Sequence, residues 1–415
     1  MPTLSSWNRI ALVLAALLVG CDGAVVADAG PDPETDAGAL DAAVVERDAG
    51  TPPEDFDGFV EWQMEYGGLP GLAVAAFTPD EVVRMGAYGY ADIESGRAVD
   101  EHTLFIMASI SKTMAVVRAM QLVEAGMLDL DAPAGDYLGY PLPNTAHPSA
   151  TVSTRSLLCH VSGLEDDFPT LATFSYTEDP PVGLDAFTRS YAVEGGEHYS
   201  AGHWNATPGG ARSYCNAGYG VVGAILEGAG GASFREQTRT GFFEPLGMDG
   251  AGWFIEDVDT SRLATPYGYN VRGRSYNPLP QNGFAFYPAS SLRISITGLT
   301  RFARMVLRGG ELDGTRVLEE ASVEEILRAQ YPSVSNGQAL GFYHQRLAGH
   351  DFIGHSGSTY GGSTQMLLAT EGTHGIILIS NSDAHVRSRI PSLTQGEEAI
   401  DAILARMDEE LRAGL

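Results

Sequence analysis

Residues 103–127 read TLFIMASISKTMAVVRAMQLVEAGM, and the architecture of the rest of the chain can be worked out from there. From residue 113 onward, apolar side chains cover most of a helix circumference, and only Arg118, Gln121 and Glu124 form a polar stripe. A helix with so narrow a polar stripe has to be surrounded by other elements, because few of its side chains suit water. We therefore predict a helix over 113–127 that is buried in the centre of the protein.

Ser109 and Lys112 stand at the beginning of this helix. Residues three apart on a helix face the same way, so the hydroxyl and the amine are expected to be neighbours. Lys112 is the only lysine beside 24 arginines, and an amine can give up its proton where a guanidinium cannot. Because burial disfavours the ammonium form, we expect a neutral lysine that takes the serine proton as the hydroxyl attacks a carbonyl. Alone, this pair of residues is a weak signal.

Strands are predicted toward both ends of the chain. A helix over 56–66 precedes strands over 71–78 and 81–91, which are joined by the turn Pro79-Asp80, and two more strands are expected over 362–369 and 374–380. Helices are expected over 153–159, 217–229, 232–242 and 297–309, and a last helix over 399–413. This layout predicts an α+β fold: one antiparallel sheet built from both chain ends, flanked by helices and interrupted by an all-helical insert.

The composition excludes several classes of protein. With 415 residues and 44% hydrophobic content, the chain can bury a large core. A formal net charge of -28 would repel phosphate backbones, so we expect no nucleic-acid partner. The three cysteines, Cys21, Cys159 and Cys215, form no CxxC pair, so no structural zinc site is predicted. Cys159 and Cys215 are either a disulfide or two small buried residues.

The first 57 residues differ from the rest. The apolar run over 10–20 is too short to span a bilayer and suits the core of a signal peptide, and Leu18-Val19-Gly20-Cys21 resembles the bacterial lipoprotein lipobox. That resemblance implies cleavage before Cys21 and its acylation; an ordinary secretory signal or a buried helix are the alternatives. Eleven acids between residues 22 and 57 predict a solvated tether. We therefore divide the chain into a signal peptide (1–20), a disordered acidic tether (21–57) and a folded domain (58–415), anchored in a bacterial cell envelope facing the periplasm or exterior.

Two further triplets accompany Ser109 and Lys112. Tyr214-Cys215-Asn216 precedes a predicted helix, and His355-Ser356-Gly357 precedes a predicted strand. In this order, Ser-x-x-Lys, Tyr-x-Asn and a basic residue, a hydroxyl and a glycine resemble the serine β-lactamase and penicillin-binding-protein superfamily, and the Tyr-x-Asn form is similar to its class C branch. Segments such as TRSLLCHVSGL (154–164) and GHSGSTYGGSTQMLL (354–368) also resemble the family, and the likeness covers about residues 59–385.

This resemblance implies a sheet subdomain (58–112 and about 285–415) beside a mainly helical one (about 113–284), with the active site between them. Ser109 would attack the substrate and form an acyl-enzyme, while Lys112 and Tyr214 share the general base and acid work. Asn216 would bind the acyl group and help to fix Lys112. No metal and no organic cofactor is implied, and the partner is a small-molecule or peptide substrate.

The resemblance also assigns the third triplet to substrate binding. His355 would lie on an edge strand across the cleft, near Tyr214, followed by Ser356. Gly357 would leave room for extended substrate, and the backbone N–H groups of Ser109 and Ser358 would form the oxyanion hole. His160, in the segment 154–164, is interpreted as structural.

The third triplet departs from the class C pattern. Lys-Thr-Gly is usual there, whereas His355-Ser356-Gly357 is more similar to DD-carboxypeptidases, D-amino-acid peptidases and esterases of the superfamily. A lysine keeps its charge for a substrate carboxylate, but a histidine is only partly charged at neutral pH, which an esterase tolerates more easily than a carboxypeptidase. We expect a serine hydrolase of esters or D-amino-acid amides; a true β-lactamase and a non-catalytic ligand-binding lipoprotein are the alternatives.

Overall fold

The computed structural model describes residues 51–390 and 392–414. The predicted signal peptide, Cys21 and most of the acidic tether lie outside the described residues. The first element is helix α2 (Phe56–Gly67), whose N-terminus is capped by the Asp55 side chain accepting a hydrogen bond from the Gly58 N–H. This helix matches the prediction over 56–66.

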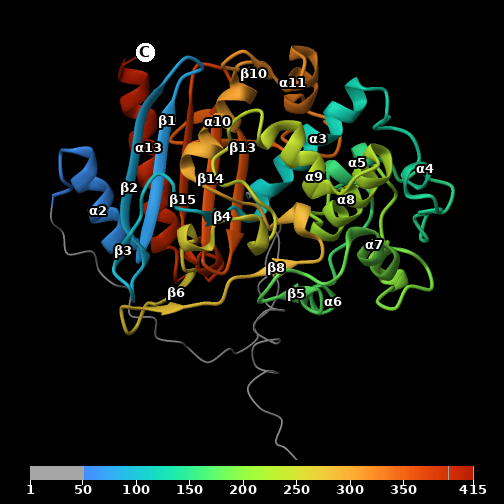
Figure 1. Cartoon of the computed structure of the whole chain (residues 1–415), viewed down its shortest axis with the longest axis horizontal. Helices are drawn as coiled ribbons and strands as arrows, with labels where there is room; N and C mark the ends of the chain where they lie inside the picture. The colour runs from blue at the N-terminus through green and yellow to red at the C-terminus, as the bar shows by residue number, and fades with distance from the viewer. Residues whose placement is uncertain (1–50, 391, 415) are drawn as a thin grey trace, which may run out of the picture.

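A seven-stranded antiparallel sheet is the centre of the fold (Figure 1). Its strand order is β12-β13-β14-β15-β1-β2-β3. The strands are β1 (Gly71–Phe77), β2 (Val82–Asp92), β3 (Arg97–Ala98), β12 (Tyr343–Leu347), β13 (His350–Thr359), β14 (Gly362–Ala369) and β15 (Gly375–Ser380). Strand β1 pairs with β15 from Leu72 opposite Ser380 to Phe77 opposite Gly375. The prediction that both chain ends complete one antiparallel sheet is therefore confirmed.

The alternation of side chains along the strands divides the core in two. In β1, Leu72, Val74 and Ala76 pack with α2 and the C-terminal helix α13 (Gln395–Gly414). The intervening Ala73, Ala75 and Phe77 belong to the larger core on the opposite face. Successive residues of a strand point to opposite faces, so a strand buried on both sides needs an uninterrupted apolar sequence, as GLAVAAF provides. The sheet thus lies between two layers that contain helices.

The predicted central helix is α3 (Ser111–Glu124), preceded by the short 3-10 turn η1 (Ala108–Ile110). Ten of its residues are buried, and it packs against α8 (Asn216–Gly230) and α9 (Phe234–Thr238). Part of its polar stripe is used inside the protein. Arg118 Nε donates to Gln237 Oε1 at 2.9 Å, and Gln121 Nε2 donates to the carbonyls of Gly241 and Val317. Glu124 Oε1 accepts the Glu319 N–H at 2.8 Å, so all three polar residues bind neighbouring segments.

The region between the two halves of the sheet is mainly helical. Besides α3, α8 and α9 it contains α4 (Gly135–Leu138), α5 (Thr154–Leu158), α6 (Phe168–Ala172) and α7 (Leu184–Ala192), and α10 (Ile296–Leu307), α11 (Glu320–Leu327) and α12 (Ala384–Arg387) follow. The helix predicted over 232–242 is divided into α9 and the π-turn η3 (Arg239–Phe243). Four short two-stranded ladders accompany the helices: β4 (Phe105–Ile106) with β9 (Arg293–Ile294), β5 (Ser175–Tyr176) with β8 (Gly283–Phe284), β6 (Tyr267–Asn270) with β7 (Ser275–Pro278), and β10 (Glu311–Leu312) with β11 (Thr315–Arg316).

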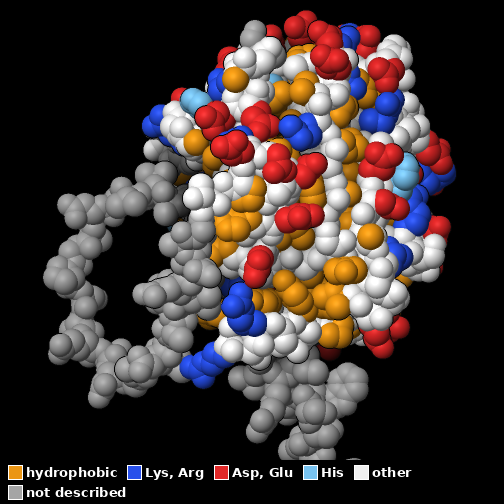
Figure 2. Space-filling view, turned by 90° about the vertical axis from the view of Figure 1, so that its left-hand side faces the viewer, with side chains coloured by type: hydrophobic (Ala, Val, Ile, Leu, Met, Phe, Trp, Pro, Cys, Tyr) orange, Lys and Arg blue, Asp and Glu red, His pale blue; other side chains and the backbone are white. Residues whose placement is uncertain are grey.

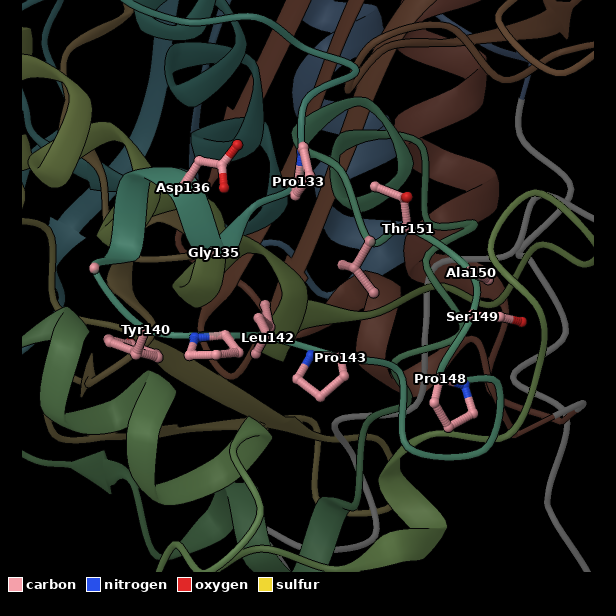
Figure 3. Close-up of a pocket in the computed structure, with 13 residues that line it drawn as sticks. Pro133, Gly135, Asp136, Tyr140, Leu142, Pro143, Pro148, Ser149, Ala150 and Thr151 are labelled. Carbon is pink, nitrogen blue, oxygen red and sulfur yellow. The ribbon is translucent and has the colours of Figure 1, made fainter.

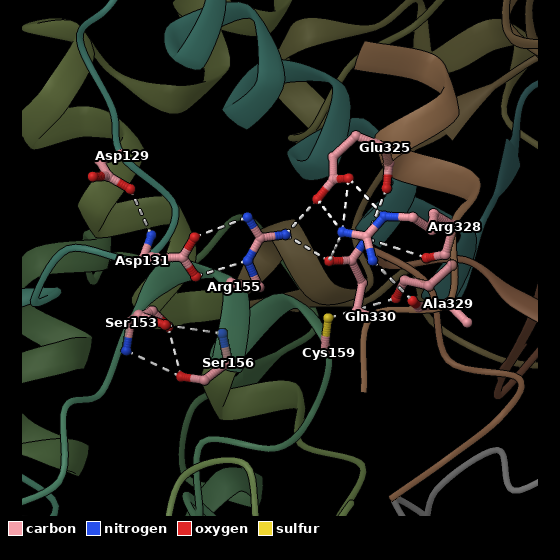
Figure 4. A network of polar contacts seen from close by, with 11 residues as sticks. Asp129, Asp131, Ser153, Arg155, Ser156, Cys159, Glu325, Arg328, Ala329 and Gln330 are labelled. Carbon is pink, nitrogen blue, oxygen red and sulfur yellow. Dashed lines mark hydrogen bonds and ion pairs between the residues drawn. The ribbon is translucent and has the colours of Figure 1, made fainter. Parts of the chain in front are cut away.

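A polar network ties α5 to its surroundings (Figure 4). The Arg155 guanidinium donates to both carboxylate oxygens of Asp131, at 2.7 and 2.9 Å, and to Glu325 in α11 at 2.6 Å. The same guanidinium reaches Gln330 Oε1 at 2.5 Å. A planar guanidinium suits such paired acceptors. The network fixes α5, which leads directly into Cys159 and His160 beside the candidate site.

The outer side of the molecule, over α2 and β2, carries acidic side chains scattered between hydrophobic ones (Figure 2). Val83 and Tyr90 of β2 are about half exposed, at 53% and 50%. None of the helices in the two described ranges is long and apolar enough to cross a membrane.

Candidate active site

Ser109 lies in η1, just before the first residue of α3, and its side chain is almost completely buried. The preceding residue, Ala108, has a φ of 46°, a left-handed conformation that is uncommon for a residue with a Cβ. Such a conformation costs of the order of 1–3 kcal/mol and persists only where the surroundings impose it. The backbone is thus held in an unfavourable shape beside the residue that the sequence indicates as nucleophile.

The Ser109 hydroxyl is bracketed by two groups. Lys112 Nζ lies 3.1 Å from Ser109 Oγ, as the spacing of three predicted, and Tyr214 Oη lies 2.8 Å from it. Lys112 and Tyr214 come from segments about a hundred residues apart, and Tyr214 directly precedes the N-cap of α8. The structure therefore brings together the three residues predicted to act in catalysis.

The Lys112 amine is fully buried and has three acceptors. It donates to Ser109 Oγ, to Asn216 Oδ1 at 2.8 Å and to the carbonyl oxygen of Ala289 at 3.0 Å. It also lies over the ring faces of Tyr214 and Tyr219, 4.7 and 5.3 Å from their centroids. An ammonium group has three N–H donors and is attracted by aromatic faces, so this geometry suits the charged form. It does not favour the neutral amine that burial alone led us to expect.

His160 packs against the Tyr214 ring, with ring centroids 4.3 Å apart. Its Nδ1 accepts the Cys215 N–H at 3.1 Å, and its backbone has a φ of 59°. Burial lowers the pKa of His160 far below its ordinary value, so the ring is neutral and Nδ1 stays an acceptor. His160 therefore orients Tyr214, which agrees with the structural role expected for it.

His355 lies on strand β13, with its ring 6.4 Å from that of Tyr214 and 5.0 Å from that of Tyr343. The ring is buried, and its Nδ1 lies 2.6 Å from the Ser356 carbonyl, which can only accept. Burial, assisted by the charge of Lys112, lowers the pKa of His355 to about 3. The ring is therefore neutral across the physiological pH range, with Nδ1 as donor.

Strand β13 is not the edge strand that was expected, because β12 lies outside it. However, the β12 register ends at the pair Tyr343 and Gly354, so within the described part of the chain residues 355–359 have no strand partner on that side. The Ser356 N–H donates to Tyr343 Oη there, at 3.1 Å. Backbone N–H groups alternate along a strand, so the Ser358 N–H points to the same open side. The role of Ser358 as an oxyanion donor stays a prediction.

Gly357 is required by packing. A Cβ at this position would lie 2.3 Å from the Met107 carbonyl oxygen and 2.2 Å from Thr364 Oγ1. Met107 immediately precedes the turn that holds Ser109. The missing side chain therefore lets the nucleophile segment approach the sheet. The room for extended substrate that the resemblance implied at Gly357 stays a prediction.

Asp166, like Tyr219 and Tyr343, is a residue of this region that the sequence did not reveal. Its carboxylate accepts hydrogen bonds from the side chain and the backbone N–H of Asn216, and from the N–H of Ala217. It stands in the run Glu165-Asp166-Asp167, and the sequence carries no signal that the middle acid alone turns toward Asn216. Cys215 Sγ also contacts it, at 3.4 Å.

Cys159 and Cys215 are both buried free thiols, so the alternative of two small buried residues holds and the disulfide does not. Burial raises the pKa of the Cys159 thiol to about 12. Among the described residues, no group of three His, Cys, Asp or Glu side chains is placed to hold a metal ion.

A surface hollow of about 500 Å³ lies elsewhere, between α4 and the proline-rich loop that follows it (Figure 3). Its lining residues fall within 133–152 and include Asp136, Tyr140 and Thr151. None of the predicted site residues lines it, so its size gives no information about the substrate of Ser109.

Together, the fold and this arrangement define a serine acyl hydrolase. The chain belongs to the Beta-lactamase family, whose sequence model matches residues 56–396. It is thus a serine hydrolase of the β-lactamase and penicillin-binding-protein superfamily, as the resemblance implied.

Three curated relatives show how varied this superfamily is. The chain is 30% identical to penicillin-binding protein 4 of Amycolatopsis lactamdurans over 276 residues, 63% of this chain and 67% of the relative. It is 29% identical to esterase EstB of Burkholderia gladioli, over 56% of this chain and 58% of that protein. It is 26% identical to a D-aminopeptidase of Cereibacter sphaeroides, over 78% of this chain and 59% of that protein. The chain thus spans only about three fifths of the length of the esterase and the D-aminopeptidase.

Solved structures share the fold. The D-amino acid amidase from Ochrobactrum anthropi SV3, complexed with L-phenylalanine amide, superposes with a TM-score of 0.65 at 22% identity. The match covers 86% of this chain and 100% of the amidase chain.

Proposed function

We propose that the protein hydrolyses esters or D-amino-acid amides that carry no free carboxylate beside the scissile bond. The observation that carries this proposal is the neutral, buried His355 in the position where class C relatives have a lysine. A neutral imidazole cannot form an ion pair with a substrate carboxylate. The similarity to an esterase and to a D-aminopeptidase supports the same two classes of substrate.

We propose the following roles for the site residues. In this scheme Tyr214 enters the reaction as a tyrosinate, which the charge of Lys112 stabilises. Ser109 Oγ attacks the carbonyl carbon while the Ser109 proton passes to Tyr214 Oη, 2.8 Å away. The backbone N–H groups of Ser109 and Ser358 bind the developing oxyanion. Tyr214 then returns the proton to the leaving alcohol or amine, which departs and leaves the acyl-enzyme. Water releases the acyl group by the reverse proton route.

Asn216, His355, Ser356 and Gly357 complete the proposed site. The Asn216 amide binds the acyl group beside Lys112, and the open side of β13 from His355 to Ser358 receives the substrate backbone. In this scheme no metal or organic cofactor takes part.

A matched pair of substrates tests the proposal. A short peptide ending in D-Ala-D-Ala with a free carboxylate is compared with the same peptide as its C-terminal methyl ester or amide. We expect kcat/KM to be at least about tenfold higher for the uncharged form, since desolvating a carboxylate that finds no charged partner costs about 1–3 kcal/mol or more. A preference for the free acid would contradict the proposal.

Labelling experiments test the nucleophile at the same time. Intact mass is measured after incubation with a fluorophosphonate, with p-nitrophenyl butyrate and with penicillin, for the wild type and for Ser109→Ala. We expect a fluorophosphonate adduct that disappears in Ser109→Ala, rapid turnover of the butyrate ester and little turnover of penicillin. A wild type without label and without turnover would instead favour a ligand-binding protein.

We also propose that the protein is exported and anchored in the cell envelope through lipid on Cys21. The apolar run over 10–20 and the lipobox-like segment before Cys21 support this. The membrane would then be a partner only through the anchor. Incorporation of radiolabelled palmitate in a bacterial host, lost in Cys21→Ala, is the expected result, and equal labelling of both would refute it.

A further inference from the structure

Asp166 lies behind Asn216 as seen from Lys112. Its Oδ2 accepts the Asn216 side-chain N–H at 2.8 Å and the Asn216 backbone N–H at 2.9 Å, and its Oδ1 accepts the Ala217 N–H at 2.9 Å. Asn216 Oδ1 in turn accepts from Lys112 Nζ at 2.8 Å. Asp166, Asn216, Lys112 and Ser109 therefore form one chain of hydrogen bonds.

The two ends of this chain determine the orientation of the amide between them. A carboxylate can only accept hydrogen bonds, and an ammonium can only donate them. The Asn216 amide therefore has one arrangement that satisfies both neighbours, with its nitrogen toward Asp166 and its oxygen toward Lys112. If the amide turned over, its nitrogen would face the donors of Lys112 and its oxygen would face the acceptors of Asp166.

Asp166 also supplies the negative charge nearest to Lys112 along this chain of bonds. Three acceptors of the Lys112 amine are a hydroxyl, an amide and a backbone carbonyl, and these three are uncharged. A buried charge is costly unless an opposite charge or several dipoles offset it. Burial raises the pKa of the Asp166 carboxyl, and the N–H groups at the start of α8 oppose this by favouring the carboxylate.

We propose that Asp166 is a positioning residue that acts through Asn216 to hold Lys112 as an ammonium beside Ser109. This inference rests on the proposed acyl-enzyme mechanism for its catalytic consequence. Its structural part, the coupling between Asp166 and Lys112, does not depend on the substrate. A simple helix cap would be a weaker explanation, because Cys215 Sγ already accepts the Gly218 N–H as the N-cap of α8.

The experiment compares Asp166→Asn with Asp167→Asn. The control removes the same charge from the adjacent residue, whose carboxylate accepts the Thr170 N–H at the start of α6 and does not contact Asn216. Because Lys112 is the only lysine, ¹⁵N-lysine labelling gives a single side-chain resonance whose titration is followed directly. The second measurement is the rate of fluorophosphonate labelling of Ser109, at a temperature where all variants are folded.

In Asp166→Asn we expect the Lys112 titration midpoint to move to lower pH by about one unit, because a nearby anion is lost. The labelling rate should fall about 10- to 100-fold, part of the contribution of general acid–base catalysis. Asp167→Asn should leave the midpoint unchanged and the rate within about threefold. In the double variant Asp166→Asn/Asn216→Ala, the loss should not exceed that of Asn216→Ala, since the two residues act in series.

An unchanged midpoint and rate in Asp166→Asn, with only a lower melting temperature, would overturn the inference and leave Asp166 as a helix cap. If Asp166→Asn does not fold, Asn216→Leu takes its place, because it keeps the backbone N–H groups that Asp166 binds and removes the side-chain amide that joins Asp166 to Lys112. Its midpoint is expected to fall likewise, and an unchanged one would again overturn the inference. A wild type that fluorophosphonate does not label would refute the proposed function, while the lysine titration would still decide the coupling.

Discussion

Gly357→Ala is the substitution whose outcome the structure defines most narrowly. The added Cβ would lie 2.3 Å from the Met107 carbonyl oxygen, 2.2 Å from Thr364 Oγ1 and 3.2 Å from Ala108 Cβ. Thr364 Oγ1 cannot simply turn away, because it donates to that same Met107 carbonyl at 3.0 Å. The substitution therefore drives strand β13 away from the segment that carries Ser109.

The expected size of the effect follows from these distances. A carbon and a carbonyl oxygen approach to about 3.3 Å at closest, so the Met107 segment has to move by about 1 Å. Forcing one extra carbon into a packed core typically costs about 1–3 kcal/mol of unfolding free energy. A displacement of about 1 Å at a reacting group can cost about 100-fold in rate. We expect both losses in Gly357→Ala.

The assay is urea denaturation combined with the rate of fluorophosphonate labelling. Gly268→Ala is the matched control, because a Cβ on this strand glycine would come no closer than 3.5 Å to Asp383 Oδ2. It should change neither quantity appreciably. If Gly357 served only to admit extended substrate, Gly357→Ala would keep its stability and its labelling by a small fluorophosphonate and would lose only peptide turnover. That result would refute the packing argument.

Three other predictions follow from the site and from the far side of the sheet. Tyr214→Phe keeps the ring that packs on His160 but removes the hydroxyl that lies 2.8 Å from Ser109 Oγ. The kcat for p-nitrophenyl butyrate hydrolysis should therefore fall about 10²- to 10⁴-fold, with an unchanged melting temperature. A loss below about tenfold would show that Tyr214 does not transfer the proton. The pKa of His355 is lowered to about 3 in the folded state from an unfolded value near 6.5, so its contribution to stability is present above pH 6.5 and is lost as the pH falls toward 3. In urea denaturation, the unfolding free energy of the wild type should therefore fall by about 2 kcal/mol more between pH 6.5 and pH 5 than that of His355→Gln. An equal fall in both proteins would contradict the assignment. Asp408 in α13 is buried and accepts hydrogen bonds from His374, His350 and Arg412. Asp408→Asn should therefore lower the unfolding free energy by about 3–5 kcal/mol, while the rate of fluorophosphonate labelling of the folded protein stays the same. A change in unfolding free energy below about 1 kcal/mol would show that these contacts contribute little.

The parts of the fold that were predictable are those that neighbouring residues determine. The continuous apolar run of β1 indicated a strand buried on both faces, and the narrow polar stripe of α3 indicated a central helix. Helices α7 and α11 were not predicted, since they have only nine and eight residues and carry few local signals. The outer strand β12 was not predicted either, and the edge position of β13 was an expectation from the family resemblance.

The sequence alone determined that Ser109 and Lys112 are neighbours, because one turn of helix joins them whatever the rest of the chain does. Only the tertiary structure decided what surrounds this pair. It placed Tyr214 against Ser109, and it turned Asp166 toward Asn216 out of three successive acids. It also buried His355 deeply enough to keep the ring neutral. Charge state and orientation depend on burial and on partners distant in the chain, and these exist only once the sheet and the helices have packed together.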